Sequence, residues 1–201
     1  MTKVMLSQTS PTKTEARRRV TVRSLARAGM RWMVRGLALF GAVVAIFWLT
    51  MDVSVVVSPS MHPTLQGTDV DTGDRVITEK LSFWFRRPRR WEVITFTNSA
   101  GEKRMKRVAG LPGESVQMLV PGELLIDGER IDIPSSFNRK YLRYGNLTDG
   151  KPVACGDGYY VLGDDLKDSD DSRFNGPTSA NRILGRAWLI VWPFTRLGFV
   201  N

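Results

Sequence analysis

The sequence predicts a mainly β protein in which a single N-terminal transmembrane helix precedes an antiparallel β-sheet domain with a small inserted β cap. Three observations lead to this fold class. An uncharged apolar run occupies residues 36–51, short β-type runs separated by turn residues follow it, and residues 52–201 show no long amphipathic helical pattern. The 201 residues are enough for one domain and an additional segment.

The apolar run at residues 36–51 lies between Arg35 and Asp52 and carries no charge. As a helix it would be roughly 24 Å long, and flanking residues extend it toward the ~30 Å hydrocarbon core of a bilayer. The alternatives are a buried core helix and a cleavable secretion signal. A core helix usually has a polar face, which this run lacks, and a secretion signal ends in an Ala-x-Ala-like site, whereas this run ends in Leu-Thr-Met. We therefore expect a membrane anchor.

The positive charge of the chain is concentrated before this anchor. Lys and Arg number 29 against 20 Asp and Glu, which gives a net charge of +9. Residues 1–35 carry nine basic residues and one acid, so residues 36–201 have a net charge of only +1. This distribution disfavours a body that binds nucleic acid. By the positive-inside rule, residues 1–35 form a basic cytosolic tail and residues 52–201 lie on the opposite face of the membrane.

The start of the tail is rich in Ser, Thr and Arg and poor in acids. We therefore expect residues 1–29 to lack regular structure. The same composition also suits a mitochondrial targeting segment, and that alternative stays open.

Eight strands are predicted in the body, because runs with strand-forming composition alternate with turn pairs such as Asp-Gly and Pro-Gly. The runs are residues 54–57, 75–80, 93–97, 104–109, 115–120, 123–126, 159–162 and 186–192. Residues 121–158 are less hydrophobic and are interrupted by Gly and Pro, which indicates the small inserted cap.

The chain has one cysteine, Cys155, and one histidine, His62. These counts exclude an intramolecular disulfide and a thiolate zinc site, and they disfavour a histidine-rich metal centre. His62 is two residues from Ser60, but residues so close in sequence seldom orient one another productively, and no third group is evident to fix its tautomer. We expect the chemistry to depend on Ser, Lys, Asp, Glu or Arg, without a metal or a cofactor.

Three segments are notable because each combines candidate reactive residues with turn-forming residues. In residues 57–65, Pro63 ends regular strand pairing just after Ser60, so the serine hydroxyl can face a cleft. In residues 105–114, Lys106 shares a strand face with the apolar residue two positions later.

The third segment, residues 163–177, contains a dense run of ionisable residues. By itself that run would suggest an exposed loop or a calcium site. Its spacing lacks the pattern of an EF-hand, which argues against calcium.

Taken together, the three segments resemble the bacterial type I signal peptidases, membrane-bound serine proteases that remove signal peptides from exported preproteins. The resemblance rests on Ser-Met-x-Pro-Thr at residues 60–64, Lys-Arg-Val-Ala-Gly-Leu-Pro-Gly at residues 106–113, and Gly-Asp…Ser-x-Asp-Ser-Arg…Gly-Pro at residues 163–177. The motifs occur in the order of the family behind one apolar span, and the match covers most of residues 52–201.

The resemblance implies that Ser60 is the nucleophile and Lys106 the general base, a Ser–Lys dyad. It also implies that the Ser58 hydroxyl and the Ser60 backbone N–H stabilise the oxyanion, and that Ser169 orients the lysine amine. Residues expected to support the site structurally are Met61, Arg107, Asp164, Asp171 and Arg173.

A lysine base requires an environment that penalises its charged form, because the unperturbed pKa of lysine is about 10.4. Burial supplies such a penalty by desolvation. Val108 and Met61 are the apolar walls that the sequence offers, and the basic residues at positions 103, 104 and 107 would act in the same direction.

Three positions depart from the family pattern. Asp165 and Leu166 stand where members of the family commonly have Asn and Arg, which affects the packing of the loop and leaves substrate preference open. Pro59 replaces a residue that is often glycine and stiffens the approach to the nucleophile. We expect Cys155, in a Gly-rich turn, to take no part in the chemistry.

The expected substrate is a preprotein that binds in an extended conformation at a sheet edge. The resemblance implies small side chains at the first and third positions before the cut, and a location on the outer face of the bacterial cytoplasmic membrane. Related Ser–Lys peptidases that process conjugation pilins or mitochondrial inner-membrane proteins are alternatives, as is an inactive membrane-anchored assembly protein. Residues 83–91 alternate aromatic residues with four arginines, so they either touch lipid headgroups or form a loop whose aromatics enter the core.

Overall fold

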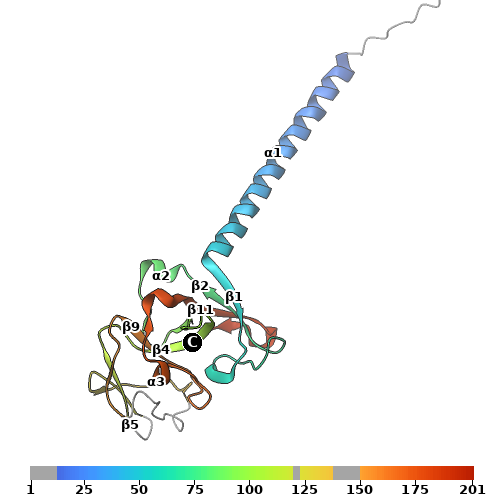
Figure 1. Cartoon of the computed structure of the whole chain (residues 1–201). Helices are drawn as coiled ribbons and strands as arrows, with labels where there is room; N and C mark the ends of the chain where they lie inside the picture. The colour runs from blue at the N-terminus through green and yellow to red at the C-terminus, as the bar shows by residue number, and fades with distance from the viewer. Residues whose placement is uncertain (1–12, 120–122, 138–149) are drawn as a thin grey trace, which may run out of the picture. The chain divides into compact units, whose positions relative to one another are not determined.

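The structure is a computed structural model that describes residues 13–119, 123–137 and 150–201. The chain divides into two units, Met1–Leu49 and Thr50–Asn201. The first unit is dominated by one long helix, and the second contains the strands and all the residues of the predicted site (Figure 1).

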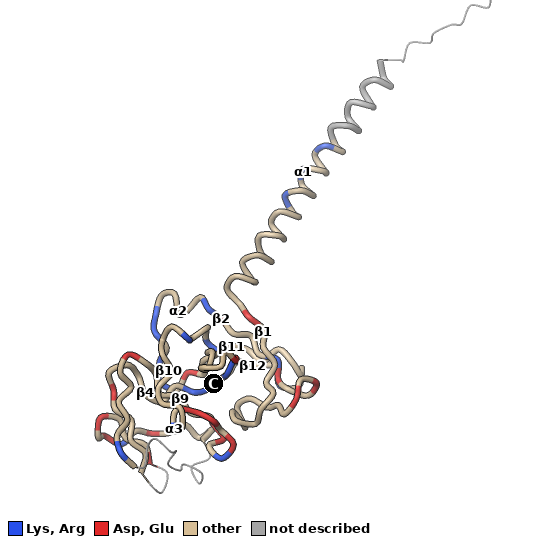
Figure 2. Tube along the Cα trace, in the orientation of Figure 1, with Lys and Arg blue, Asp and Glu red and all other residues tan. Residues whose placement is uncertain are grey.

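Helix α1 spans Lys13–Thr50. Its part from Leu25 to Thr50 is long and apolar enough to cross a membrane, and the half after Arg35 carries no charge (Figure 2). The expectation that residues 1–29 lack regular structure is wrong from Lys13 onward. Arg, Ala and Leu are good helix formers, and a helix already nucleated in the apolar run extends at low cost into such residues.

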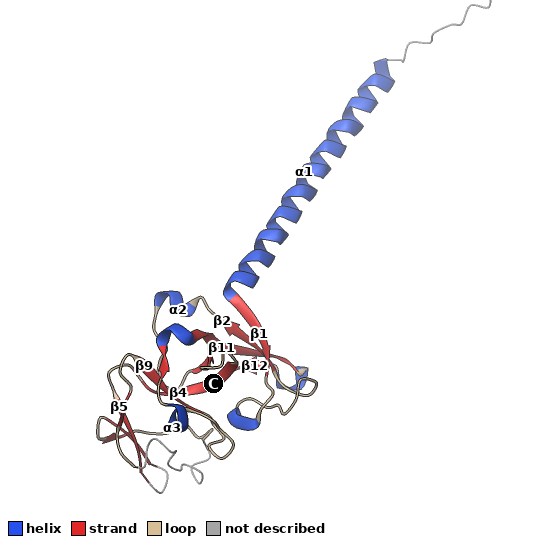
Figure 3. Ribbon diagram, in the orientation of Figure 1, coloured by secondary structure: helices blue, strands red, loops and turns tan. Residues whose placement is uncertain are grey.

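The larger sheet of the body is antiparallel, and strands dominate the second unit (Figure 3). Its strand order is β1 (Met51–Val55), β2 (Arg75–Glu79), β11 (Ile183–Trp192), β3 (Val93–Thr97), β4 (Lys103–Gly110), β9 (Gly158–Leu162) and β10 (Thr178–Ser179), and β12 (Gly198–Phe199) pairs with β11. The sheet curves so that β1, at one end of this order, approaches β4, because Asp52 of β1 forms an ion pair with Lys103 of β4 although three strands lie between them in the sheet.

The smaller sheet is also antiparallel and has the order β7 (Glu129–Arg130), β6 (Glu123–Ile126), β5 (Ser115–Leu119) and β8 (Val153–Ala154). It begins at Ser115, ahead of the segment 121–158 in which the sequence places an inserted cap. Asp127 and Gly128 turn the chain between β6 and β7 with φ angles of 52° and 84°. Two consecutive positive φ values suit an Asp-Gly hairpin turn.

Each of the eight predicted strand runs coincides with a strand of the structure, within a few residues at the ends. The remaining described strands, β7, β8, β10 and β12, have two residues each and are too short to show an alternating pattern. The described short helices of the body are α2 (Ser82–Phe85), α3 (Ser172–Asn175) and the 3-10 turns η1 (Pro59–Met61), η3 (Ala180–Arg182) and η4 (Phe194–Arg196).

The aromatic side chains of the segment around α2 divide between the core and the surface. Phe83 and Trp91 are partly buried and pack against core clusters. Trp84 and Phe85 keep 64% and 83% of their surface exposed.

Opposite faces of β3 and β4 meet different apolar clusters, and this arrangement positions the site. One cluster contains Ile94 and Val108, and the other contains Met61 and Val93. Because successive residues of a strand point to opposite faces, Lys106 points with Val108 toward the first cluster. The lysine amine therefore lies at the border of an apolar region.

Candidate active site

Ser60 lies in the short turn η1, which follows β1. Pro59 occupies the first turn of η1, and the backbone N–H of His62 donates to the carbonyl of Pro59 (2.8 Å). The carbonyl of Ser60 accepts from the backbone N–H of Asp165 (3.1 Å), which ties the turn to the loop of the third motif. Ser60 is buried, so its hydroxyl is held in a fixed place.

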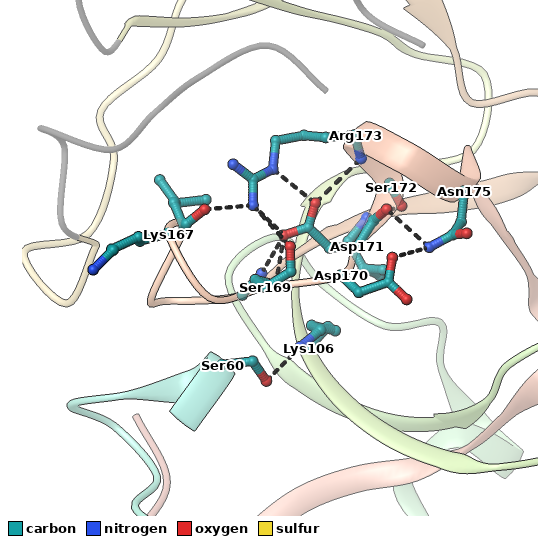
Figure 4. A network of polar contacts seen from close by, with 12 residues as sticks. Ser60, Lys106, Lys167, Ser169, Asp170, Asp171, Ser172, Arg173 and Asn175 are labelled. Carbon is teal, nitrogen blue, oxygen red and sulfur yellow. Dashed lines mark hydrogen bonds and ion pairs between the residues drawn. The ribbon is translucent and has the colours of Figure 1, made fainter. Parts of the chain in front are cut away.

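Lys106 extends from β4 toward this hydroxyl. It is paired in the sheet with Ile94 and retains only 2% of its surface exposed. Its Nζ lies 2.5 Å from Ser60 Oγ, and the two side chains point toward each other in Figure 4. The structure thus brings together two residues that are 46 positions apart in the sequence.

Burial lowers the pKa of the Lys106 amine from its usual 10.5 to about 8. The positive charges of Arg104 and Arg173 lower this pKa as well, whereas the carboxylates of Asp171 and Asp170 raise it. The neutral fraction of such an amine at pH 7 is about 10%, against about 0.03% for a lysine with a pKa of 10.5. The site therefore supplies a usable base near neutral pH.

Ser58 lies beside the pair, with its Oγ 3.1 Å from Ser60 Oγ. Ser169 is buried, and its hydroxyl donates to Asp171 Oδ2 (2.6 Å). In the described part of the chain, no hydrogen bond joins Ser169 to the Lys106 amine, which is the contact that the resemblance implies. Ser169 is instead part of the polar network behind the lysine (Figure 4).

Gly163, which the sequence analysis did not single out, allows these parts to pack. A β-carbon at this position would lie 2.2 Å from Ser169 Oγ and 2.4 Å from the carbonyl oxygen of Ser60. Any side chain here would push apart the nucleophile turn and the loop that follows β9. In the sequence, the signal that indicates this glycine is the Gly-Asp pair at the start of the third motif.

Two buried ion pairs hold the loop of the third motif. Arg107 binds Asp164 through two contacts of 2.7 Å, and Arg173 binds Asp171 through contacts of 2.8 and 3.0 Å. All four side chains are nearly inaccessible to solvent. Breaking such a pair by removing one partner strongly destabilises the fold, because the other partner is left as an unpaired buried charge.

Thr64 completes the first of these pairs, since its hydroxyl donates to Asp164 and accepts from Arg107 Nη2. The Ser-Met-x-Pro-Thr motif is thereby joined to both other motifs. Met61, in the same motif, is 2% exposed and packs in the cluster that contains Val93.

The dyad opens into a groove of about 600 Å³. One side is formed by residues 53–58 and the other by residues 102–106, with Ser60, Met61 and Thr95 completing the lining. Among the described strands β1 pairs only with β2, and β4 pairs with β9 only from Arg107 onward. Both sides of the groove therefore present backbone groups that lack a strand partner in the described structure.

The other residues considered from the sequence lie away from the dyad or play structural parts. His62 is exposed. Cys155 is buried in the apolar cluster of the smaller sheet, and desolvation raises the pKa of its thiol to about 11. Leu166 packs in the same cluster, which gives a physical reason for an aliphatic residue at this position. Pro59 forms the first turn of η1 as described above.

No group of three or more His, Cys, Asp or Glu side chains is arranged to hold a metal ion within the residues that the structure describes.

The fold and the site define a class of protein. A β-sheet domain sets a serine hydroxyl against a buried lysine amine, next to an open groove, which is the arrangement expected of a serine hydrolase with a lysine base. A sequence model of the family described as signal peptidase, peptidase S26, matches residues 29–192. The chain belongs to this family.

Individual relatives agree with this membership. The chain is 36% identical over 151 residues to signal peptidase I of Leptolyngbya laminosa, covering 70% of this chain and 68% of the relative. It is 31% identical over 181 residues to probable signal peptidase I-2 of Synechocystis sp., covering 85% and 78%. It is 34% identical over 158 residues to signal peptidase I of Bacillus caldolyticus, covering 72% and 81%.

Proposed function

We propose that this protein is a membrane-anchored serine endopeptidase that removes signal peptides from exported preproteins, with Ser60 as nucleophile and Lys106 as general base. The single observation that carries the assignment of the residues is the 2.5 Å contact between Lys106 Nζ and Ser60 Oγ in a buried setting. Membership in the signal peptidase family supports the reaction and the kind of substrate.

In the proposed reaction the neutral Lys106 amine accepts the Ser60 proton while the serine oxygen attacks a peptide carbonyl. The ammonium then gives this proton to the leaving amine, and an acyl-enzyme ester on Ser60 remains. Water, deprotonated by the same lysine, hydrolyses the ester. The original serine proton leaves with the amine product, and the proton taken from water passes from Lys106 to the released Ser60 oxygen, so the dyad is regenerated and water is the only co-reactant.

The oxyanion of each tetrahedral intermediate needs donors. We assign this part to the backbone N–H of Ser60 and the hydroxyl of Ser58, because the Ser58 oxygen lies 3.1 Å from the nucleophile. Preorganised donors of this kind act most strongly where water is excluded.

The groove suits an extended peptide. Its two sides offer backbone groups that an added strand would satisfy, which is the usual basis of affinity in strand addition. Val55, Met61 and Met105 line the groove close to the dyad. These apolar residues favour small, uncharged side chains at the first and third positions before the cut.

The N-terminal unit supports a single-pass arrangement. We propose residues 1–35 as a basic cytosolic tail, residues 36–51 as the anchor, and residues 52–201 as the peptidase domain with a cap within 121–158. The concentration of Lys and Arg before the apolar run favours a catalytic domain on the outer face of the bacterial cytoplasmic membrane. The exposed Trp84 and Phe85 suit contact with the bilayer surface.

Cleavage of a preprotein by the full-length protein in detergent tests this function. We expect Ser60→Ala and Lys106→Ala to abolish cleavage and His62→Ala, an exposed neighbour of the nucleophile, to retain it. Full activity in either dyad variant would refute the assignment. An inactive wild-type protein would favour the assembly-protein alternative, and cleavage of a pilin precursor in preference to other preproteins would favour the related processing peptidases.

A further inference from the structure

A cavity of about 460 Å³ lies beside the short helix α2, in a part of the body that the proposed reaction does not use. Its lining includes Phe83 of α2, the arginines Arg86 and Arg87 that follow α2, Tyr159 of β9 and Ile183 of β11. Among the residues that the structure describes, none lines both this cavity and the substrate groove. The cavity is therefore separate from the groove that holds the dyad.

The fold brings α2 close to the point where the apolar helix ends. Both helix α1 and its candidate membrane span end at Thr50, and the backbone N–H of Lys80 donates to the Thr50 carbonyl (2.8 Å). Helix α2 begins at Ser82, two residues after Lys80, and two residues reach at most about 7 Å. Figure 1 shows α2 at the end of the body where β1 begins. With the chain anchored through this span, α2 lies next to the membrane surface.

The side chains that α2 exposes suit this position. Trp84 is 64% exposed and Phe85 is 83% exposed. Tryptophan is enriched where a membrane meets water, because its ring is apolar and its N–H is polar. These two side chains are therefore placed to enter the headgroup region beside the cavity.

The positive charge after α2 is only partly compensated. Four of the five residues that follow this helix are arginines, and two of them, Arg86 and Arg90, form ion pairs with glutamates. No ion pair joins Arg87 or Arg89 to any residue in the described part of the chain. The described carboxylate in the cavity lining is that of Asp157, which is exposed. A guanidinium without a carboxylate partner is well suited to bind a phosphate group.

Tyr159 provides a polar group in the cavity wall that lacks a partner. It is only 2% exposed and packs with Phe83 and Ile183 in an apolar cluster, yet it also lines the cavity. Within residues 13–119, 123–137 and 150–201, its hydroxyl makes no hydrogen bond. A buried hydroxyl without a partner costs free energy unless a ligand or water satisfies it. Desolvation raises the pKa of this phenol, against the effect of the Arg87 charge, so the hydroxyl remains a donor at neutral pH.

We propose that this cavity binds the phosphate group of an anionic phospholipid from the membrane that anchors the chain. Arg87 and the Tyr159 hydroxyl donate to the phosphate oxygens, while Trp84 and Phe85 enter the surrounding headgroups. The inference rests on the proposed function, because the single-pass arrangement brings α2 to the lipid. The span and the bound lipid together give the body two attachment points, which limit its rotation on the membrane surface.

The experiment uses full-length protein in micelles of a neutral detergent, titrated with photoactivatable phosphatidylglycerol. Mass spectrometry of the labelled peptides follows the segment around α2, so lipid bound near the basic residues before the span is counted separately. The half-saturation concentration of this labelling measures the affinity of the cavity. We expect Arg87→Gln and Tyr159→Phe each to raise it about three- to tenfold, since each removes one hydrogen bond to a charged group.

Controls separate this recognition from general attraction and from damage to the fold. Arg130→Gln removes an exposed arginine of the smaller sheet and should leave the half-saturation concentration unchanged. Without lipid, Tyr159→Phe should have a Tm equal to or above that of the wild type, because the lost hydroxyl has no partner among the described residues. Unlabelled phosphatidylglycerol should compete with the labelling, whereas phosphatidylcholine and inorganic phosphate at the same concentration should not.

A higher half-saturation concentration in both cavity variants, with an unchanged control, would support the proposal. An unchanged value in either cavity variant, or an equal rise in Arg130→Gln, would overturn it. Inorganic phosphate that competes as well as the lipid would show that the cavity takes a free phosphate, which also overturns it. Alkaline extraction of membranes tests the anchor separately. A protein that stays in the membrane but shows no effect of the cavity variants refutes only the lipid site, whereas a released protein refutes the single-pass arrangement.

Discussion

Replacing Lys106 with methionine should make the protein more stable at neutral pH while it abolishes activity. Methionine has a similar length and fits the apolar surroundings of the lysine. Folding lowers the pKa of Lys106 from 10.5 to about 8. Below pH 8 the lysine is protonated in both states, but the folded protein binds this proton more weakly than the unfolded chain does. This difference costs the wild-type protein about 3 kcal/mol of stability.

The sign of the pH dependence follows from the same pKa. The cost is complete below pH 8, falls as pH rises from 8 to 10.5, and is absent above 10.5, where the amine is neutral in both states. After allowance for the lost contact with Ser60, we expect Lys106→Met to gain about 2 kcal/mol at pH 7, or roughly 4–8 °C in Tm. The gain should disappear toward pH 10.5.

Thermal unfolding of the full-length protein in detergent, followed by tryptophan fluorescence at pH 7 and pH 10.5, measures this difference. Lys103→Met serves as the control, because the Lys103 side chain is about half exposed and no comparable gain is expected. A lower Tm for Lys106→Met at pH 7, or a gain that is the same at both pH values, would refute the reasoning.

Two further predictions concern residues that touch or support the dyad. Ser58→Ala should lower kcat about 100-fold with little change in KM, since one oxyanion donor contributes about 2.7–4 kcal/mol, and an unchanged kcat would remove Ser58 from the oxyanion site. Asp164→Asn should destabilise the body by about 3–5 kcal/mol, because it leaves the buried Arg107 guanidinium without its counter-charge. Thermal unfolding tests this value, and a loss below 1 kcal/mol would show that the pair does little to hold the loop.

The strands of the body can be predicted from the sequence where runs of strand-forming residues are bounded by turn residues. Residues 93–97 and 123–126 were placed with the bounds that β3 and β6 have in the structure. Two-residue strands such as β10 are too short to show a strand-forming pattern, so they cannot be predicted from the sequence. The helical part of the tail cannot be predicted from its own composition, because it extends a helix that is formed by the apolar run after it.

Ser60 and Lys106 could be named from their motifs, but their contact could not be derived from the residues alone. It depends on η1 and β4 being brought together by a sheet that curves until Asp52 reaches Lys103. The hydrogen bond of Ser169 shows a similar limit. A serine hydroxyl can donate to a carboxylate and can also accept from an amine, and only the three-dimensional arrangement shows that Ser169 donates to Asp171.

The structure also distinguishes basic neighbours that look equivalent in the sequence. Arg104 shares a face with Lys106 and lowers its pKa, whereas Arg107 lies on the opposite face and is paired with Asp164. Strand alternation separates the two positions, but it does not reveal that a buried carboxylate compensates one of them.

The protonation state of Lys106 can be measured directly by nuclear magnetic resonance on full-length protein labelled with 15N at the lysine side chains. The resonance that is missing from Lys106→Met identifies the residue, and its shift is followed from pH 6 to pH 11. The account predicts a midpoint near pH 8. A midpoint near 10.5, the value of an ordinary solvated lysine, would contradict it, because Ser60 would then have no base at neutral pH.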